Sequence, residues 1–364
     1  MSFGLPVIEC GGRIDSVVAV LDGASLLIEA GPQLRWLTGF NGSAGWLLAN
    51  KSESVLFVDA RYTERAREQI AMAGLDLEVI TNTNYEKLFN EIASRHDGNG
   101  LVINGSDVDV ITYRKIADAF KVEPIVKEDP TAQFRRIKTP AELARIELAA
   151  KITDIAVAKT LTLDWTTFTE RELASRLAIE MRAAGSDREA FDTIVASGPN
   201  GSRPHHESGD RRIAEGDAVI VDIGSMIDGY HSDMTRTFFI GAVDPFLAEA
   251  YAVVEAAQEA GVRACVPGAE LAEVDAACRG VLRESGLERY FTTGTGHGIG
   301  LKIHEDPFVG KTSKGMLLLA DIITVEPGIY CEGVGGIRIE DTVSLESGGP
   351  RRITLTTKDT SCPR

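Results

Sequence analysis

The sequence predicts two domains, an α/β domain followed by an α+β domain made of two similar halves. The chain has 364 residues, which is more than a single hydrophobic core usually organises. Short apolar runs alternate with helical periodicity up to about residue 128, a pattern typical of an α/β domain. Beyond that point the order helix, helix, β-rich segment occurs twice, which indicates a duplicated unit with pseudo-twofold symmetry. We therefore expect domains at 1–130 and 131–364.

The first domain contains four strand-like apolar runs and three segments with helical periodicity. The turn-rich stretch Val122–Thr131 follows them and indicates a linker, because its Asp129-Pro130 step disfavours helix. The expected strands are Ser25–Glu29, Gly45–Ala49, Ser54–Val58 and Leu101–Ile103, and the expected helices are Tyr62–Ala73, Tyr85–Ser94 and Ile111–Phe120.

Two capping boxes mark helices at the start of the second domain. Thr139 with Glu142, and Thr169 with Glu172, each pair an N-cap hydroxyl with a glutamate three residues later. The second of these helices should end at Gly185. The β-rich segments are Phe191–Ile240 and Leu317–Leu345, and the second pair of helices is expected at Phe246–Ala260 and Glu270–Ser285. A duplicated domain of this kind should carry its site where the two halves meet.

The charge balance disfavours nucleic acids and anionic membranes as partners. The chain carries 54 acidic and 38 basic residues, and a formal charge of -16 repels phosphate groups, although an acidic surface also simply promotes solubility. The sequence has no run of about 18 apolar residues and no basic segment leading into an apolar one, so we expect neither a membrane span nor a signal peptide. Five scattered cysteines without a C-x-x-C spacing favour reduced thiols and a cytoplasmic location.

A predicted β-hairpin at residues 218–240 carries an aspartate on each of its two strands. Its turn is centred near Ile227, Asp228 and Gly229, and folding the chain about that turn sets Asp222 roughly opposite Asp233. Side chains opposed on one face of a ribbon have Cβ atoms only ~4.5–5.5 Å apart, so the two carboxylates repel unless a cation lies between them. The alternative is that one aspartate caps a turn while the other is solvated.

A second predicted hairpin and a glycine-flanked histidine supply further polar groups. Glu326 and Glu340 flank a glycine-rich turn, and their even spacing lets both face the same side. His297 lies in the stretch GTGHGIG, where glycines let the backbone approach a ligand closely, and His304 follows seven residues later. Each histidine taken alone is also compatible with a structural or surface role.

Together these residues suit a pair of divalent cations. Four carboxylates and one imidazole are mostly hard oxygen ligands, and four negative charges balance two divalent cations. Paired metal ions lower the pKa of a bridging water and polarise a carbonyl, which is the chemistry of amide hydrolysis. Such a reaction needs neither a serine triad nor a cysteine nucleophile.

Three stretches of the second domain resemble the metal-site motifs of the pita-bread metallopeptidases, the family that includes methionine aminopeptidase, aminopeptidase P and prolidase. The stretches are VDIGSMIDGYHSDMTR, GTGHGIG and the glutamate-bearing hairpin, and the resemblance covers roughly residues 137–364. It implies a pita-bread catalytic domain in which Asp233 and Glu340 bridge two metal ions. The ligand set that it implies is Asp222, Asp233, His297, Glu326 and Glu340.

The same resemblance implies catalytic roles for four residues. His205 follows the run NGSRP and His304 opens the run HEDP, and both would contact the substrate or the tetrahedral intermediate. Arg338 would orient a bridging carboxylate, and Glu326 would carry a proton from the attacking water to the leaving nitrogen. Because His206 adjoins His205, either histidine could hold the first role.

The first domain resembles the creatinase-like N-terminal domain of aminopeptidase P and prolidase. The segments LTGFNGSAG at 37–45 and VDARYTERAREQ at 58–69 carry that likeness. With the run Phe191–Gly201, it indicates the Xaa-Pro branch of the family. One position departs from this branch, in which a histidine is common four residues before the metal-binding one. Thr293 stands there, so a neutral hydroxyl replaces a group that can carry charge.

The resemblance implies a dinuclear metal-dependent exopeptidase that hydrolyses the bond before proline in short peptides, either an Xaa-Pro aminopeptidase or an Xaa-Pro dipeptidase. We expect manganese, and cobalt, zinc or iron also suit these ligands. Members of the family are often homodimers, and we expect one here. Two alternatives share the fold: a creatinase-like C–N hydrolase and a binding protein without catalytic activity.

Overall fold

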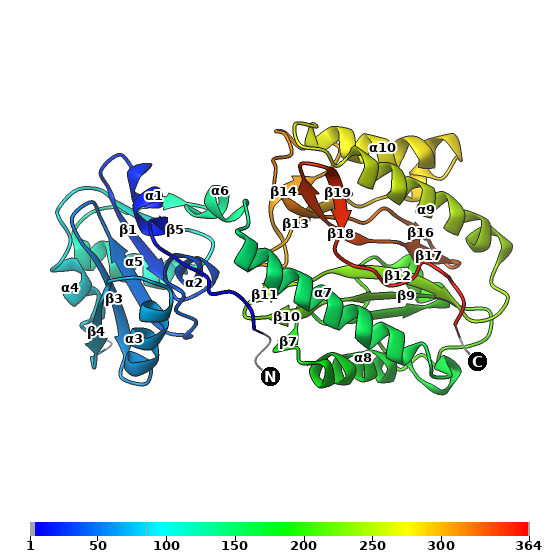
Figure 1. Cartoon of the computed structure of the whole chain (residues 1–364), viewed down its shortest axis with the longest axis horizontal. Helices are drawn as coiled ribbons and strands as arrows, with labels where there is room; N and C mark the ends of the chain where they lie inside the picture. Colours follow the sequence, from blue (N-terminus) through cyan, green and yellow to red (C-terminus); the bar gives the residue numbers. More distant parts are fainter. Residues whose placement is uncertain (1–3, 85, 363–364) are drawn as a thin grey trace. The chain divides into compact units, whose positions relative to one another are not determined.

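The computed structural model describes residues 4–84 and 86–362, and Figure 1 shows their arrangement. The chain forms two compact units: Pro6–Arg135 make up the first, and the second contains the chain from Arg136 onward. Tyr85, the expected first residue of a helix, lies outside the described residues. The predicted order of an α/β part before an α+β part is confirmed.

A six-stranded mixed sheet forms the centre of the first unit. Its strand order is β4-β3-β2-β1-β5-β6, with antiparallel pairing among β1, β2 and β3 and parallel pairing elsewhere. The strands are β1 (Ser25–Glu29), β2 (Gly45–Ala49), β3 (Ser54–Asp59), β4 (Glu78–Asn82), β5 (Leu101–Asn104) and β6 (Ile125–Lys127). The helices are α1 (Arg13–Ala19), α2 (Pro32–Thr38), α3 (Thr63–Met72), α4 (Leu88–Ala93), α5 (Val110–Phe120) and α6 (Ala132–Arg135).

The two strands that the sequence does not predict lie at the edges of this sheet. β4 is only partly buried, and all three residues of β6 are exposed, so neither has the apolar run that marks a buried strand. β6 lies inside Val122–Thr131, which the sequence predicts to be a linker; that prediction is wrong for Ile125–Lys127, because these residues pair in parallel with β5.

The first half of the second unit packs two helices against a three-stranded antiparallel sheet of order β12-β9-β8, beside a small sheet of order β11-β10-β7. Both predicted capping boxes are present, at Thr139 and at Thr169. The elements are α7 (Pro140–Thr160), η1 (Trp165–Thr167), α8 (Glu170–Ala184), β7 (Arg188–Glu189), β8 (Ile194–Ser197), η2 (Gly198–Ser202), β9 (Ala218–Ile223), β10 (Ser225–Ile227), β11 (Tyr230–His231) and β12 (Met234–Phe239).

The second half repeats the order of two helices followed by strands. A five-stranded antiparallel sheet has the order β14-β13-β15-β18-β19, and β16 and β17 form a separate ribbon. The elements are α9 (Pro245–Ala264), α10 (Leu271–Glu284), η3 (Glu288–Tyr290), β13 (Gly296–Gly298), β14 (Glu305–Val309), β15 (Ile322–Val325), β16 (Gly328–Cys331), β17 (Gly335–Arg338), β18 (Asp341–Glu346) and β19 (Gly349–Arg352). No helix among the described residues is long and apolar enough to span a bilayer.

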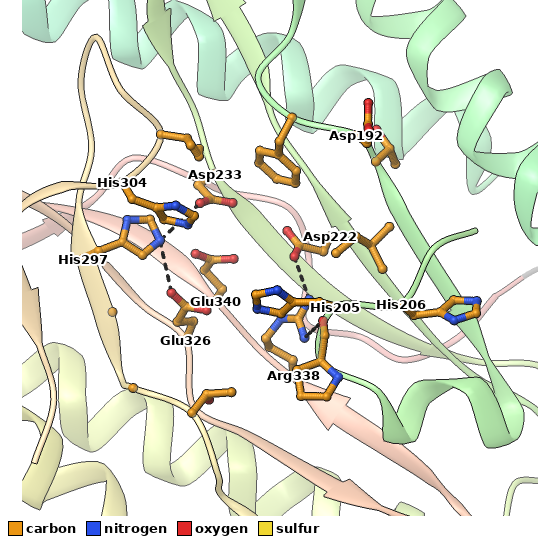
Figure 2. A pocket seen from close by; sticks show the side chains of 18 of the residues that line it. Asp192, His205, His206, Asp222, Asp233, His297, His304, Glu326, Arg338 and Glu340 are labelled. Atoms are coloured by element: carbon orange, nitrogen blue, oxygen red, sulfur yellow. Dashed lines mark hydrogen bonds and ion pairs between the residues drawn. The ribbon is translucent and has the colours of Figure 1, made fainter. Parts of the chain in front are cut away.

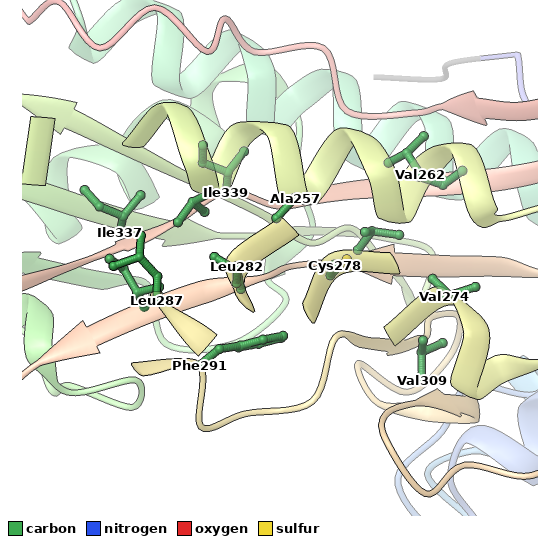
Figure 3. Close-up of a cluster of buried hydrophobic side chains, with 14 of the residues drawn as sticks. Ala257, Val262, Val274, Cys278, Leu282, Leu287, Phe291, Val309, Ile337 and Ile339 are labelled. Atoms are coloured by element: carbon green, nitrogen blue, oxygen red, sulfur yellow. The ribbon is translucent and has the colours of Figure 1, made fainter. Parts of the chain in front are cut away.

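Each half of the second unit has its own hydrophobic core. In the second half, Val262 of α9 and Leu282 of α10 belong to one buried cluster with Ile337 of β17, as Figure 3 shows. In the first half, Leu177 of α8 packs in a cluster with Val221 of β9. The two helix pairs therefore cover opposite sides of the strands (Figure 1), and the strands of the two halves meet between them.

Candidate metal centre

Asp222 and Asp233 project from the ribbon formed by β9 and β12. Asp222 lies opposite Thr235 in the register of these strands. Asp233 comes just before β12, so it lies diagonal to Asp222. The sequence predicts instead that the two aspartates lie roughly opposite each other. The offset follows from the turn, because Asp228 and Gly229 are its two central residues and the uninterrupted register then sets Asp222 opposite Thr235.

Glu326 and Glu340 occupy matching positions in the second half. Glu326 lies between β15 and β16, and Glu340 lies between β17 and β18. The backbone N–H of Glu326 donates to the carbonyl of Thr295 at 2.8 Å, and that of Glu340 donates to the carbonyl of Thr235 at 3.0 Å. The second bond crosses from one half to the other, so it fixes Glu340 against the ribbon that carries the aspartates. Figure 2 shows both glutamates pointing into the same space.

His297 completes the group from the central position of β13. Its Nδ1 lies 3.0 Å from the carbonyl oxygen of Gly298, which leaves Nε2 facing the carboxylates. Nε2 is 3.3 Å from Oε1 of Glu326 and 3.6 Å from Oδ2 of Asp233. A Cβ atom at Gly296 would lie 1.9 Å from a carbonyl oxygen of β15, so the close packing that positions the imidazole requires glycine there.

The cluster contains ligand atoms that have no partner in the protein. Asp233, His297 and Glu340 each offer one possible metal-ligand atom, and these three atoms lie within 4.8 Å of one another. Oδ1 of Asp222 and Oε1 of Glu340 are buried and accept no hydrogen bond from any described residue. A buried carboxylate oxygen without a donor is costly, and a cation relieves that cost. The residues present therefore fit divalent metal ions.

The pKa values of Asp233, Glu340 and His297 are all raised, for different reasons. Burial, followed by neighbouring carboxylates, raises the pKa of both Asp233 and Glu340 well above the usual range. Burial alone would lower the pKa of His297, but the hydrogen bond and charge of Glu326 raise it to about 9. The cluster thus favours any added positive charge, whether a proton or a metal ion.

Arg338 lies buried behind the cluster, with 4% of its surface exposed. Its Nη2 donates to Oδ2 of Asp222 at 2.6 Å, its Nε to Oγ1 of Thr235 at 3.0 Å and its Nη1 to the hydroxyl of Tyr330 at 2.9 Å. Burial raises the pKa of Asp222, and this guanidinium opposes the rise. The Thr235 hydroxyl donates to Oε2 of Glu340 at 2.8 Å. Arg338 therefore contacts Asp222 directly, and it reaches Glu340, the expected bridging carboxylate, through one hydroxyl.

The structure distinguishes His205 from its neighbour His206. Nε2 of His206 lies 2.7 Å from Oε2 of Glu170, and both side chains are buried. His205 is exposed and lines the cavity around the cluster, and Figure 2 shows it beside Arg338 while His206 points away. A substrate contact is therefore open to His205, whereas His206 holds a buried glutamate.

His304 and Thr293 also line the cavity. The ring of His304 packs edge-on against His297, with 4.3 Å between ring centroids and 86° between planes. Burial, together with the nearby His297, lowers the pKa of His304, so its ring is neutral at pH 7. The Oγ1 atom of Thr293 is buried without a hydrogen-bond partner among the described residues.

An open cavity of about 850 Å³ surrounds these groups, and its walls come from both halves of the second unit. That size accommodates a small organic ligand such as a short peptide. Every site residue that the sequence predicts lines it: Asp222, Asp233, His297, Glu326, Glu340, His205, His304 and Arg338.

Two supporting residues are missing from the sequence prediction. Thr235 shares a strand face with Asp233 because the two are two residues apart, so strict alternation could have identified it. Tyr330 carried no such signal, since an aromatic residue in a strand equally predicts a hydrophobic core.

Clustered buried carboxylates around an imidazole, in an open cavity on a duplicated α+β fold, define a metal-dependent hydrolase. Residues 144–347 match the model of metallopeptidase family M24, and residues 18–137 match the Creatinase/Prolidase N-terminal domain. The chain belongs to metallopeptidase family M24 and has its pita-bread fold. Membership implies that the protein uses divalent metal ions.

Relatives and solved structures match nearly the whole chain. An uncharacterized peptidase of Bacillus subtilis, YqhT, is 36% identical over 92% of this chain and 94% of its own length. The Xaa-Pro dipeptidase of Bacillus anthracis has a TM-score of 0.92 at 32% identity, covering 96% of this chain and 99% of that one. The X-Pro aminopeptidase of Thermotoga maritima has a TM-score of 0.85 at 29% identity, covering 95% and 99%.

Proposed function

We propose that this protein is a metal-dependent exopeptidase that hydrolyses the peptide bond before proline in short peptides. The observation that carries the proposal is the convergence of four carboxylates and one imidazole on an open cavity, with buried carboxylate oxygens that accept no hydrogen bond from any described residue. Solved structures that are named for the cleavage of Xaa-Pro substrates cover nearly all of the chain, and they support this substrate class.

The proposed cofactor is a pair of divalent ions held by Asp222, Asp233, His297, Glu326 and Glu340. Asp233 and Glu340 suit a bridging role, because their donor atoms lie close to each other and to His297. Four carboxylates balance two divalent cations, and an oxygen-rich set with one imidazole suits manganese, with cobalt, zinc or iron as substitutes. When bound, such ions lower the pKa of water and polarise the scissile carbonyl.

Glu326 is the proposed proton carrier. Its side chain is 23% exposed, against 15% for Asp222 and 7% for Asp233, so it is the most accessible of these three from the cavity. Burial would raise its pKa, but the hydrogen bond and charge of His297 lower it overall, so the carboxylate is ionised. An ionised, accessible carboxylate can accept a proton from the attacking water and pass it to the leaving nitrogen.

His205, His304 and Arg338 have the proposed supporting roles. The two histidines lie on opposite sides of the carboxylates in Figure 2, where an imidazole N–H can donate to a peptide carbonyl. Arg338 would hold Asp222 in position and oppose the rise in its pKa, and through Thr235 it would orient Glu340.

We also propose a homodimer that acts in the cytoplasm. All five cysteines are free thiols and four of them are buried, which suits a reducing compartment. The homodimer rests on the resemblance to Xaa-Pro peptidases. Light scattering tests it directly, since a dimer has about twice the chain mass of 39.2 kDa and a monomer of that mass refutes the proposal.

A hydrolysis assay tests the proposed activity. The protein is stripped with a chelator, reconstituted with manganese and given Ala-Pro-Ala, with Ala-Ala-Ala and creatine as controls. We expect alanine to be released from Ala-Pro-Ala only after reconstitution, and Ala-Ala-Ala to be a poor substrate. Turnover of creatine instead supports a C–N hydrolase. Metal retention without turnover of any of the three, or of the dipeptide Ala-Pro, supports a binding protein.

A further inference from the structure

One wall of the cavity beside His297 is electrically neutral. Phe308 of β14 is the register partner of His297 in β13, and its side chain is 53% exposed and lines the cavity. Thr293 lies on the same segment as His297, four residues earlier, and presents a buried hydroxyl without a partner among the described residues. Phe308 and Thr293 thus add an aromatic ring and an uncharged hydroxyl to the lining of the cavity.

This wall is held firmly from behind by α10. Nη2 of Arg279 donates to the carbonyl of Thr293 at 2.8 Å, and Nε of the same residue donates to Asp275 at 2.7 Å. The hydroxyl of Thr295 donates to the other oxygen of Asp275 at 2.7 Å. The backbone around Thr293 is therefore fixed. Thr293 lines the cavity, and its buried hydroxyl has hydrogen-bonding capacity that no described residue uses.

The cavity as a whole offers little positive charge to a free carboxylate. Its described lining contains six carboxylates and only two guanidinium groups, those of Arg171 and Arg338. Arg338 is buried and already donates to Asp222 and two hydroxyls. Arg171 is 63% exposed and bonded to Asp210 at 3.0 Å, where solvent screens its charge. No lysine lines the cavity among the residues that the structure describes.

This distribution of charge discriminates between two kinds of Xaa-Pro substrate. An Xaa-Pro dipeptide carries its terminal carboxylate on the proline itself, directly beside the reacting bond and close to the carboxylate cluster. Without a paired cation, placing that charge in a partly desolvated cavity is unfavourable. A longer peptide has a neutral amide at the same place, which a threonine hydroxyl can bind and an aromatic ring can cover.

We propose that the neutral wall of Thr293 and Phe308 selects peptides with at least one residue after the proline, so that the enzyme acts as an aminopeptidase and not as a dipeptidase. This inference rests on the proposed function, since it specifies the substrate length of the same site. It assigns specificity to Phe308, which the sequence does not single out, and gives a role to the hydroxyl of Thr293.

Three peptides with the same scissile bond test the inference on the manganese-reconstituted enzyme: Ala-Pro, Ala-Pro-Ala and Ala-Pro-Ala amide. We expect the last two to have similar kcat/KM values, because they differ only in the charge of the C-terminal group, which lies one residue beyond the proline. We expect kcat/KM for Ala-Pro to be lower by about tenfold or more, the effect of one missing charge-assisted hydrogen bond. Equal or faster cleavage of Ala-Pro overturns the inference but leaves the proposed function intact. Failure to cleave any of them, with metal bound, overturns both.

Variants at Phe308 locate the effect. Phe308→Arg adds a cation to the wall and should raise the ratio of Ala-Pro to Ala-Pro-Ala amide turnover by about tenfold. Phe308→Gln, which has no charge, should leave that ratio unchanged, and thermal melts verify that both variants fold. An unchanged ratio in Phe308→Arg overturns the assignment to this wall. So does a tenfold lower Ala-Pro turnover in Arg171→Gln, which would place the carboxylate on Arg171 instead.

Discussion

Replacing Asp233 by asparagine should stabilise the metal-free protein while removing its response to metal. The donor atoms of Asp233 and Glu340 lie within 4.8 Å, so two full charges repel by about 3.5 kcal/mol at an effective dielectric constant of ~20. Part of this repulsion is already relieved, because burial and neighbouring carboxylates raise the pKa values of both groups. We therefore expect a net gain of about 1–3 kcal/mol for metal-free Asp233→Asn, or roughly 3–8 °C in Tm.

Manganese should stabilise the wild type much more than it stabilises Asp233→Asn. Manganese at a hundredfold excess over Kd stabilises the wild type by about 2.7 kcal/mol, whereas the variant should gain almost nothing. Differential scanning calorimetry with and without manganese, at fixed protein concentration, measures both effects. A metal-free variant that is less stable than the wild type, or one that manganese stabilises equally, refutes the reasoning.

Asp341→Asn is the matched control, because Asp341 is an equally buried neighbour of Glu340 with the opposite electrostatic setting. Its carboxylate lies 2.7 Å from Arg236 and 2.9 Å from Arg352. Burial would raise its pKa, but Arg236 and Lys358 lower it below 3.8 overall. Its stabilising contribution is therefore present above the unfolded pKa and is lost as the pH falls through the lower folded pKa. We expect Asp341→Asn to destabilise the protein at pH 7 by about 3–5 kcal/mol, and the difference from the wild type to shrink in acid.

Three further substitutions separate metal binding, substrate contact and structure. His304→Ala should lower kcat/KM about tenfold or more with unchanged metal content, and a loss of metal measured by elemental analysis would show it to be a ligand. Arg338→Met should weaken manganese affinity by about 10–100-fold in calorimetric titrations, because Asp222 loses its ion pair with Arg338, and unaltered affinity contradicts that role. His205→Ala should reduce activity with little change in Tm. His206→Ala should lower Tm, because the buried carboxylate of Glu170 loses a hydrogen-bond donor. The reverse pattern would exchange the roles of the two histidines.

Local sequence signals predicted most of the helices and strands that carry the site. The capping boxes at Thr139 and Thr169 depend on residues three apart, so they can be recognised without tertiary information, and the structure contains both. The Asp228-Gly229 turn is equally local: both residues have positive φ angles, 50° and 79°, as a tight hairpin turn requires.

Features that depend on packing between distant segments could not be predicted in the same way. The close approach of Gly224 to the carbonyl oxygen of Ser232 on the facing chain is such a feature, and a residue pattern does not reveal that contact. The relay from Arg338 through Thr235 to Glu340 joins residues about 100 positions apart in sequence. The predicted boundary at 130/131 stays a prediction; the compact units divide after Arg135.

The most direct test of the account is the metal stoichiometry of the purified protein after reconstitution and removal of unbound ions. The claim that the carboxylates and His297 share a pair of cations predicts about two divalent ions per chain by elemental analysis, and a loss of at least one in Glu340→Gln. Protein that is fully folded and retains no divalent ions, or a Glu340→Gln variant that retains as many as the wild type, would contradict it.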